Sequence, residues 1–166
     1  MRAATNPADE VARLARGLVD LKLAYEHQVV GCTEAEVAEV LKSARNFPLP
    51  AEYPEFLRRM GREAGRLLIG TDLHYPEVLD IPADAIAFAA EDAPQLDPAG
   101  KHFFAAHQGY QFYFFTREHP GTVFLYTEGD DEPVVSADTF LGWLWNHAES
   151  EATISSRFIY GNRFPS

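Results

Sequence analysis

The sequence contains one cysteine, Cys32, and no long apolar run. A single cysteine cannot form an internal disulfide, so we expect a reduced, structurally ordinary thiol and a cytoplasmic protein. No window approaches the length that crosses a membrane, and residues 1–30 lack the basic start and apolar block of a secretory signal. These absences predict a soluble chain with no membrane partner.

Basic residues are also scarce, because 14 Lys and Arg stand against 25 Asp and Glu, for a net charge of −11. Phosphate contacts are made by lysine and arginine, so this balance disfavours nucleic acid as a partner. It permits a basic protein as partner, because opposite fields steer encounter. The alternative is that the acidity only keeps the protein soluble.

The chain is long enough for one core and rich enough in apolar residues to fill it. Of its 166 residues, 46% are hydrophobic and 13% are aromatic. This size is near the usual span of one domain, so we expect a single domain over residues 1–166.

The first third of the chain has helical patterns. Apolar residues at three- and four-residue steps predict a helix from about Asp9 to Val29, ended by Gly31, with a stripe of Val11, Leu14, Leu18, Leu21 and Tyr25. Thr33 and Glu36 form the pattern of a capping box, which predicts a second helix to about residue 45. Residues 51–60 predict a short third helix after the Pro48 and Pro50 breaks.

The remaining segments favour strands more than helices. We expect, in order, a loop at 61–65, a strand at 66–70, a short helix at 82–92, two aromatic strands within 103–115, strands at 122–127 and 134–135, a helix capped by Ser136, and a tail at 149–166 that docks on the domain. Helices followed by grouped strands and a helix predict an α+β fold: an antiparallel-rich mixed sheet flanked by helices on one face and at its edges.

Six histidines raise the question of metal or acid–base chemistry. No pair of them has metal-ligand spacing, and strand alternation would point His102 and His107 to opposite faces. Residues 61–66 superficially resemble a phosphate loop but lack its lysine and the following serine or threonine. A helix dipole could lower the pKa of the Cys32 thiol, but no base can be assigned to it. We predict no catalytic residue, cofactor or metal site.

The candidate binding residues lie in two polar turns. The first holds Glu128, Asp130, Asp131 and Glu132, and the second holds Asp72 and Tyr75. Solvated turns are the alternative in both places, because turns favour Asp and Gly. Trp143 and Trp145 cannot both face inward from one helix, so one is either a surface anchor or covered by the C-terminal tail.

The order of these features resembles the SUKH superfamily, which unites bacterial toxin-immunity proteins with fungal cell-wall assembly regulators. The resembling pieces are Thr33-Glu34-Ala35-Glu36-Val37, Leu49-Pro50-Ala51-Glu52-Tyr53-Pro54-Glu55-Phe56-Leu57, His107-Gln108-Gly109-Tyr110-Gln111-Phe112, Tyr126-Thr127-Glu128-Gly129-Asp130 and Ser136-Ala137-Asp138-Thr139-Phe140-Leu141-Gly142-Trp143-Leu144. The SUKH-like core then spans residues 33–145. The helix within residues 1–31 is an addition to that core, and residues 61–65 depart from the compact Asn-Gly-Gly type of turn common in the family.

The resemblance implies a bacterial, non-enzymatic protein that binds other proteins, commonly a cognate toxin, many of which are nucleases. Its other branch implies a scaffold or regulatory module without toxin neutralisation. A hydrolase using Asp72 and His74 is a third alternative. The added helix is the obvious element for a homodimer.

Overall fold

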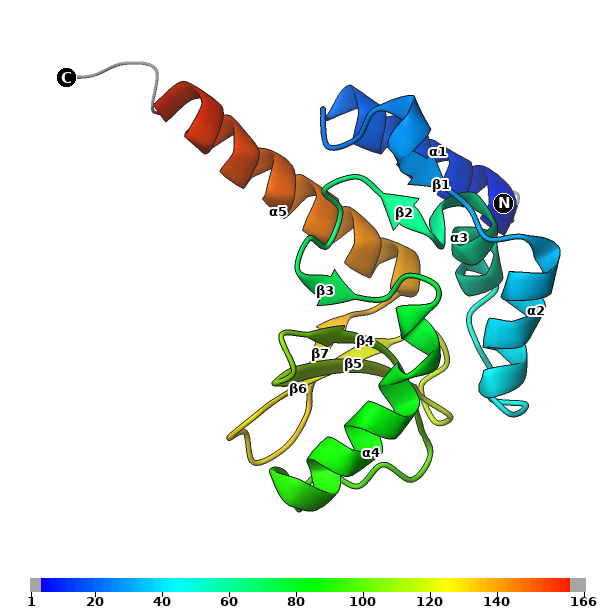
Figure 1. Ribbon diagram of the computed structural model, residues 1–166, viewed down its shortest axis with the longest axis vertical. Coiled ribbons are helices and arrows are strands. Elements are labelled where there is room, and N and C mark those ends of the chain that lie inside the picture. The colour runs from blue at the N-terminus through cyan, green and yellow to red at the C-terminus, as the bar shows by residue number, and fades with distance from the viewer. Residues whose placement is uncertain (1–3, 162–166) are drawn as a thin grey trace.

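The computed structural model describes residues 4–161, with side chains through Ser155. Its helices and strands follow in the order α1 (Pro7–Asp20), β1 (Val29–Val30), α2 (Glu34–Ser43), α3 (Glu52–Met60), β2 (Glu63–Ala64), β3 (Thr71–Asp72), α4 (Ile81–Glu91), β4 (Lys101–His107), β5 (Gln111–Thr116), β6 (Val123–Thr127), β7 (Val134–Ala137) and α5 (Phe140–Gly161). Strands β3 to β7 form one sheet in sequence order, and β1 pairs with β2 (Figure 1). All these pairings are antiparallel, which confirms the predicted α+β class.

Helices cover both faces of the five-stranded sheet, so the prediction of helices on one face and at the edges was wrong. On one face, Phe88 of α4 packs against Phe112 with ring centroids 4.9 Å apart. On the other face, Phe104 packs against Tyr53 of α3 and Trp143 of α5. The reason lies in the strands themselves, because four consecutive aromatic residues of β5 are buried and successive side chains point to opposite faces.

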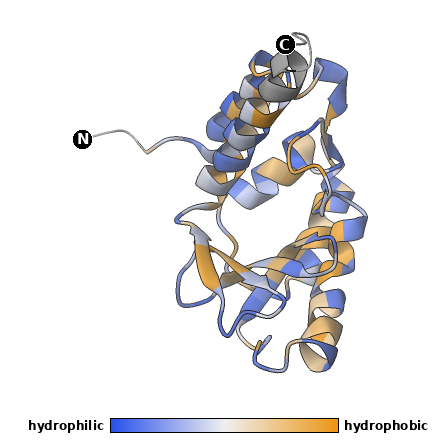
Figure 2. Ribbon diagram, turned by 90° about the vertical axis from the view of Figure 1, so that its left-hand side faces the viewer, coloured by the Kyte–Doolittle hydropathy of each residue, from blue (hydrophilic) through white to orange (hydrophobic). Residues whose placement is uncertain are grey.

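Apolar residues are concentrated where the layers meet. Figure 2 shows mainly apolar colouring on strands of the sheet and on α4, the helix at the bottom of the view. One cluster of buried side chains runs from α1 through the sheet to α5. The helices are therefore fixed against the sheet by burial of apolar surface.

The first helix is shorter than the sequence pattern indicates. It ends at Asp20, while Leu21 and Tyr25 are 39% and 71% exposed. Lys22 has a left-handed φ of 60°, which turns the chain so that Leu23 is buried instead. The spacing of apolar residues could not show that the helix ends before Lys22, because Leu21 and Tyr25 continue the same spacing.

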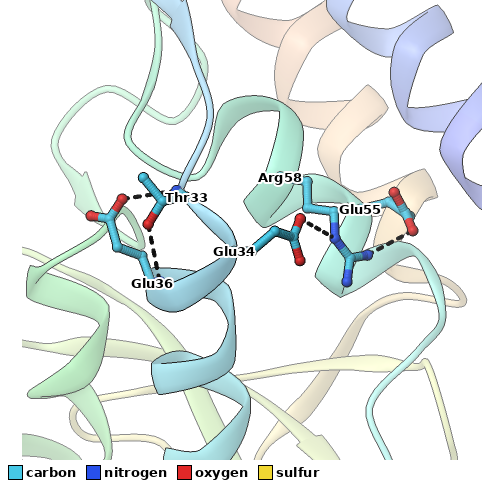
Figure 3. Close-up of polar contacts among 5 residues, drawn as sticks. All are labelled: Thr33, Glu34, Glu36, Glu55 and Arg58. Carbon is cyan, nitrogen blue, oxygen red and sulfur yellow. Dashed lines mark hydrogen bonds and ion pairs between the residues drawn. The ribbon is translucent and has the colours of Figure 1, made fainter.

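The predicted capping box at α2 is present. The Thr33 hydroxyl accepts from the Glu36 amide at 3.2 Å, and the Glu36 carboxylate accepts from the Thr33 amide at 2.8 Å (Figure 3). Arg58 of α3 donates to Glu34 and to Glu55, which ties the first turn of α2 to α3.

The segment from 61 to 70 differs from both predictions made for it. The expected loop at 61–65 contains β2, whose Ala64 lies opposite Val29 of β1. The expected strand at 66–70 is a series of turns with Leu68 at a φ of 54°. Leu68 is buried in those turns, so the apolar residues that suggested a strand serve the core in another backbone conformation.

The last helix begins later than predicted. Ser136 lies in β7 and does not cap a helix. The Thr139 hydroxyl instead accepts from the Gly142 amide at 2.9 Å, in the first turn of α5. The predicted cap was wrong because β7 extends two residues beyond the two valines that suggested it.

The segment from Glu149, expected as a tail, continues α5 through Gly161. Glu151 accepts from Arg66 at 3.0 Å, which holds this part of the helix against the turns before β3. The side chains of Phe158, Ile159 and Tyr160 lie outside the described residues.

Candidate protein-binding site

The turn between β6 and β7 presents a group of carboxylates, here called the acidic turn: Glu128, Asp130, Asp131 and Glu132. Asp130 is half-buried and the other three are exposed. Within residues 4–155, none of the four forms an ion pair. Their negative field therefore reaches solvent without a neutralising partner on this surface.

Hydrogen bonds hold the acidic turn in one conformation. The Tyr126 hydroxyl donates to the Asp130 carbonyl at 2.9 Å, and the Gln95 amide donates to the same carbonyl at 2.9 Å and to the Tyr126 oxygen. The Glu128 amide donates to the Tyr110 carbonyl at 2.8 Å. Burial is the largest cause that raises the pKa of Tyr126, and the nearby charge of Asp130 is the next. The hydroxyl therefore keeps the proton that it donates.

Two exposed valines lie beside the acidic turn. Val134 and Val135 of β7 are 51% and 56% exposed, and β7 is the last strand of its sheet. An edge strand with exposed apolar side chains is a surface that another chain can cover. Apolar residues bordered by charged ones are typical of protein interfaces.

The other two predicted binding residues lie elsewhere. Asp72 is exposed on β3, which is the opposite edge of the sheet from β7. The Tyr75 hydroxyl donates to Glu39 at 2.7 Å, and the Arg62 guanidinium lies 5.1 Å from the centre of the Tyr75 ring. The six predicted residues therefore form two separate groups and not one surface.

The group around Tyr75 is engaged in contacts within the chain. Arg62 donates to both carboxylate oxygens of Glu36, and this hydrogen bonding lowers the pKa of Glu36 to about 2. The hydrogen bond to Glu39 is the main cause that raises the pKa of Tyr75. These interactions connect α2 to the segments that flank β2 and β3.

The third alternative, a hydrolase using Asp72 and His74, gains no support from the geometry. Asp72 is exposed, His74 is half-buried, and neither lines any of the five cavities described. Burial lowers the pKa of His74. Among the residues that the structure describes, no three His, Cys, Asp or Glu side chains are grouped to hold a metal ion.

The prediction that His102 and His107 face opposite sides was wrong. They lie opposite Phe115 and Gln111, which share a face because they are four residues apart on a regular strand. A bulge between Phe103 and Ala105 adds one residue to β4. His102 and His107, which are an odd number of residues apart, therefore point to the same face. The two histidines still have separate surroundings, because His107 contacts Thr71 at 2.9 Å while His102 packs on Phe47.

Cys32 and the two tryptophans serve packing. Burial raises the pKa of the Cys32 thiol to about 11, which favours the unreactive interpretation over activation by the helix dipole. Trp143 is buried and Trp145 is half-buried. Trp145 packs against Gly17, so α1 covers it in place of the C-terminal tail.

Sequence reasoning missed Gln95, Val134 and Val135 as parts of the site. Only Pro133 separates the two valines from the acidic run, so their nearness to it in the sequence was the available signal. Nothing in the local sequence pairs Gln95 with a turn that lies 35 residues away.

A family model described as the SMI1 / KNR4 family (SUKH-1) matches residues 31–146. The acidic turn and Asp72 fall inside this range, while α1 precedes it. Comparison with curated proteins and with solved structures found no match. No helix among the described residues has the length and apolar character needed to cross a membrane.

Proposed function

The chain belongs to the SMI1 / KNR4 family (SUKH-1), and on that basis we propose that it is a non-enzymatic protein that binds a protein partner, first of all a cognate toxin, and masks it. It acts in the cytoplasm of a bacterial producing cell and in stoichiometric amounts. A homodimer through the added helix α1 remains a prediction, and the apolar residues Val11, Leu14 and Leu18 of that helix are already buried within the chain.

The observation that carries the proposal is the acidic turn held rigid beside two exposed valines. Three exposed carboxylates without ion pairs among the described residues would attract a basic surface. Val134 and Val135 point to opposite faces of the sheet, so a partner that covers the free edge of β7 would make apolar contact with one valine on each face. Because Tyr126 and Gln95 already fix the backbone of the turn, little ordering is left to be done on binding.

A nuclease toxin is the partner class that suits this surface best. An enzyme that cleaves nucleic acid has a basic groove for phosphates, and a carboxylate-bearing turn can occupy such a groove in place of the substrate. Occupation of the groove inhibits the enzyme without any bond being made or broken.

The alternative function is a scaffold or regulatory module of the cell-wall assembly regulator type. The same surface would then bind a housekeeping assembly. Co-purification from the native host distinguishes the two, because a toxin fragment supports immunity and a housekeeping complex supports the scaffold. The adjacent reading frame would encode a toxin-like C-terminal domain only under the first function.

Charge reversal tests the proposed surface. The variant Glu128→Lys/Asp131→Lys/Glu132→Lys is expected to keep its fold, because all three side chains are exposed, and to lose protection against the toxin. The control Asp20→Lys/Glu26→Lys/Glu118→Lys makes the same change in net charge at other exposed sites and is expected to protect fully.

Two results would decide against this surface. Full protection by the acidic-turn variant would reject it as the interface. Loss of protection in Asp72→Lys or Tyr75→Ala alone, with circular dichroism unchanged, would move the interface to the β3 edge of the sheet.

A further inference from the structure

A cavity of about 470 Å³ opens between the end of α2, the start of α4 and the start of β4. Six of its lining residues carry the argument: Arg45, Phe47, Ile86, Lys101, His102 and Arg117. They come from segments far apart in the sequence, and none of them belongs to the acidic turn. The size is within the range of small-molecule sites.

The charge of this cavity is opposite to that of the protein. Its lining contains Arg45, Lys101 and Arg117, and within the described part of the chain it includes no Asp or Glu. The chain as a whole carries a net charge of −11. Three cations gathered here, from a total of 14 basic residues, create a local positive field in an acidic molecule.

These cations are not neutralised by carboxylates. The Arg117 guanidinium lies 4.9 Å from the centre of the Phe47 ring, and the Lys101 ammonium donates to the Asp97 backbone carbonyl. Within residues 4–155, none of the three takes part in an ion pair with a carboxylate. Arg45 and Arg117 are exposed, so their guanidinium groups can reorient toward an anion.

His102 adds a polar group to the cavity wall. It is 7% exposed and packs on Phe47 with ring centroids 5.7 Å apart. His102 is among the residues that line the cavity. Burial lowers its pKa to about 4, so it is a neutral imidazole at pH 7. A neutral imidazole can donate a hydrogen bond through one ring nitrogen and accept one through the other, so His102 can contact a phosphate or an organic group.

We propose that this cavity binds a small organic phosphate, with the phosphate between Arg45 and Arg117 and the organic part against Phe47 and Ile86. Guanidinium groups match the geometry of phosphate oxygens through paired N–H donors. Ile86 is 55% exposed in the free protein and supplies the apolar wall. The site does not depend on the proposed protein partner.

Titration with three probes tests the proposal. Phenyl phosphate, inorganic phosphate and benzyl alcohol are added separately to the intact protein, and binding is followed by ¹H–¹⁵N NMR and calorimetry. Phenyl phosphate is expected to bind most tightly, with the largest shifts at Gly100, Lys101 and the His102 ring, because it alone has both parts.

Rim variants then assign the site. Arg117→Gln and Arg45→Gln are each expected to weaken phenyl phosphate binding on the order of tenfold, as charge-assisted hydrogen bonds are lost. Both residues are exposed, so the variants should fold. The control Arg13→Gln removes an exposed arginine from α1 and should leave the affinity unchanged.

Four outcomes overturn the proposal. Benzyl alcohol binding as tightly as phenyl phosphate would reject the anion site, and equal affinity for inorganic phosphate would reject the organic part. Affinity unchanged in both rim variants would place any binding elsewhere. So would shifts confined to a separate cavity of about 590 Å³, whose lining includes Arg16 of α1 and Arg59 of α3.

Discussion

A Cβ atom placed on Gly17 of α1 would lie 2.6 Å from Cη2 of the Trp145 indole in α5. The absence of a side chain at residue 17 therefore allows the first and last helices to pack closely. Trp145, one of two tryptophans considered as surface anchors, is covered by this contact. Helix α1, which precedes the family match, is in this way joined to the end of the core.

Gly17→Ala is expected to destabilise the fold by about 1–2 kcal/mol, because the cost of overpacking against a rigid ring exceeds the gain in helix propensity. Chemical denaturation measures the change. In a Trp145→Phe background the same substitution should be neutral or stabilising, because the smaller ring leaves room. Equal destabilisation in both backgrounds would contradict the contact.

Tyr53→Phe is expected to stabilise the protein by about 1 kcal/mol. The Tyr53 ring packs among Phe104, Phe115 and Phe140, and its buried hydroxyl finds no hydrogen-bond partner among the described residues. Removal of an unsatisfied buried polar group relieves its desolvation cost.

The matched control for that change is Tyr126→Phe. This hydroxyl is also on a fully buried tyrosine, but it donates to the Asp130 carbonyl. We expect a loss of about 1 kcal/mol there. Thermal unfolding of the two variants should shift in opposite directions, and shifts of the same sign would contradict the hydrogen-bond assignment.

Glu36 makes stability depend on pH in the acid range. Its pKa is lowered from 4.5 to about 2, chiefly by the hydrogen bond from Arg62, so the folded protein favours the carboxylate. The resulting stability is fully present above about pH 4.5 and is lost as the pH falls toward 2. Glu36→Gln should therefore destabilise the protein at pH 6 and differ less from the wild type near pH 2.5.

Urea unfolding at several pH values measures this dependence. Glu34→Gln removes a neighbouring carboxylate that is 78% exposed and pairs with Arg58 at the surface, where ion pairs contribute little. It should change stability less at every pH. A difference between Glu36→Gln and wild type that stays constant from pH 6 to 2.5 would contradict the assignment.

Gln95→Ala tests whether order in the acidic turn contributes to partner binding. The variant removes the amide that bridges Tyr126 and Asp130, without changing a carboxylate. Affinity for the partner should fall several-fold, because the turn must then be ordered on binding. Faster hydrogen exchange of the Asp130 amide, which donates to the Thr127 carbonyl at 2.9 Å, would report the loosened turn.

The control for Gln95 is Gln111→Ala, which removes a comparable bond to Thr127 within the strands. It is expected to leave both affinity and exchange in the turn unchanged. Equal effects of the two alanine variants would mean that general stability, and not order in the turn, governs binding.

Local chemistry made several elements predictable. The capping box of Thr33 and Glu36 depends on atoms three residues apart, so the pattern alone locates the start of α2. The strands around residues 103–115 were also recognisable, because a run of aromatic residues favours a pleated, buried surface. The acidic turn could also be predicted from local sequence, because Gly129 and its acidic neighbours are typical of turns.

Features that depend on distant partners were not predictable. The end of α1 and the pairing of Val29 with Ala64 depend on where the chain turns back. The bulge in β4 changed the face of His102, and one residue is enough because strand side chains alternate. The cation-lined cavity likewise gathers Arg45, Lys101 and Arg117 from three segments.

The amino-acid order alone set the α+β class, the acidic character and most helix and strand positions, because these follow from composition and from contacts within a few residues. Tertiary packing decided which surface is free. It placed helices on both faces, buried Val11, Leu14 and Leu18 of α1, packed Trp145 against Gly17, and separated Asp72 from the acidic turn. The physical reason is that burial depends on which segments meet in space, and a local sequence pattern carries no information about that.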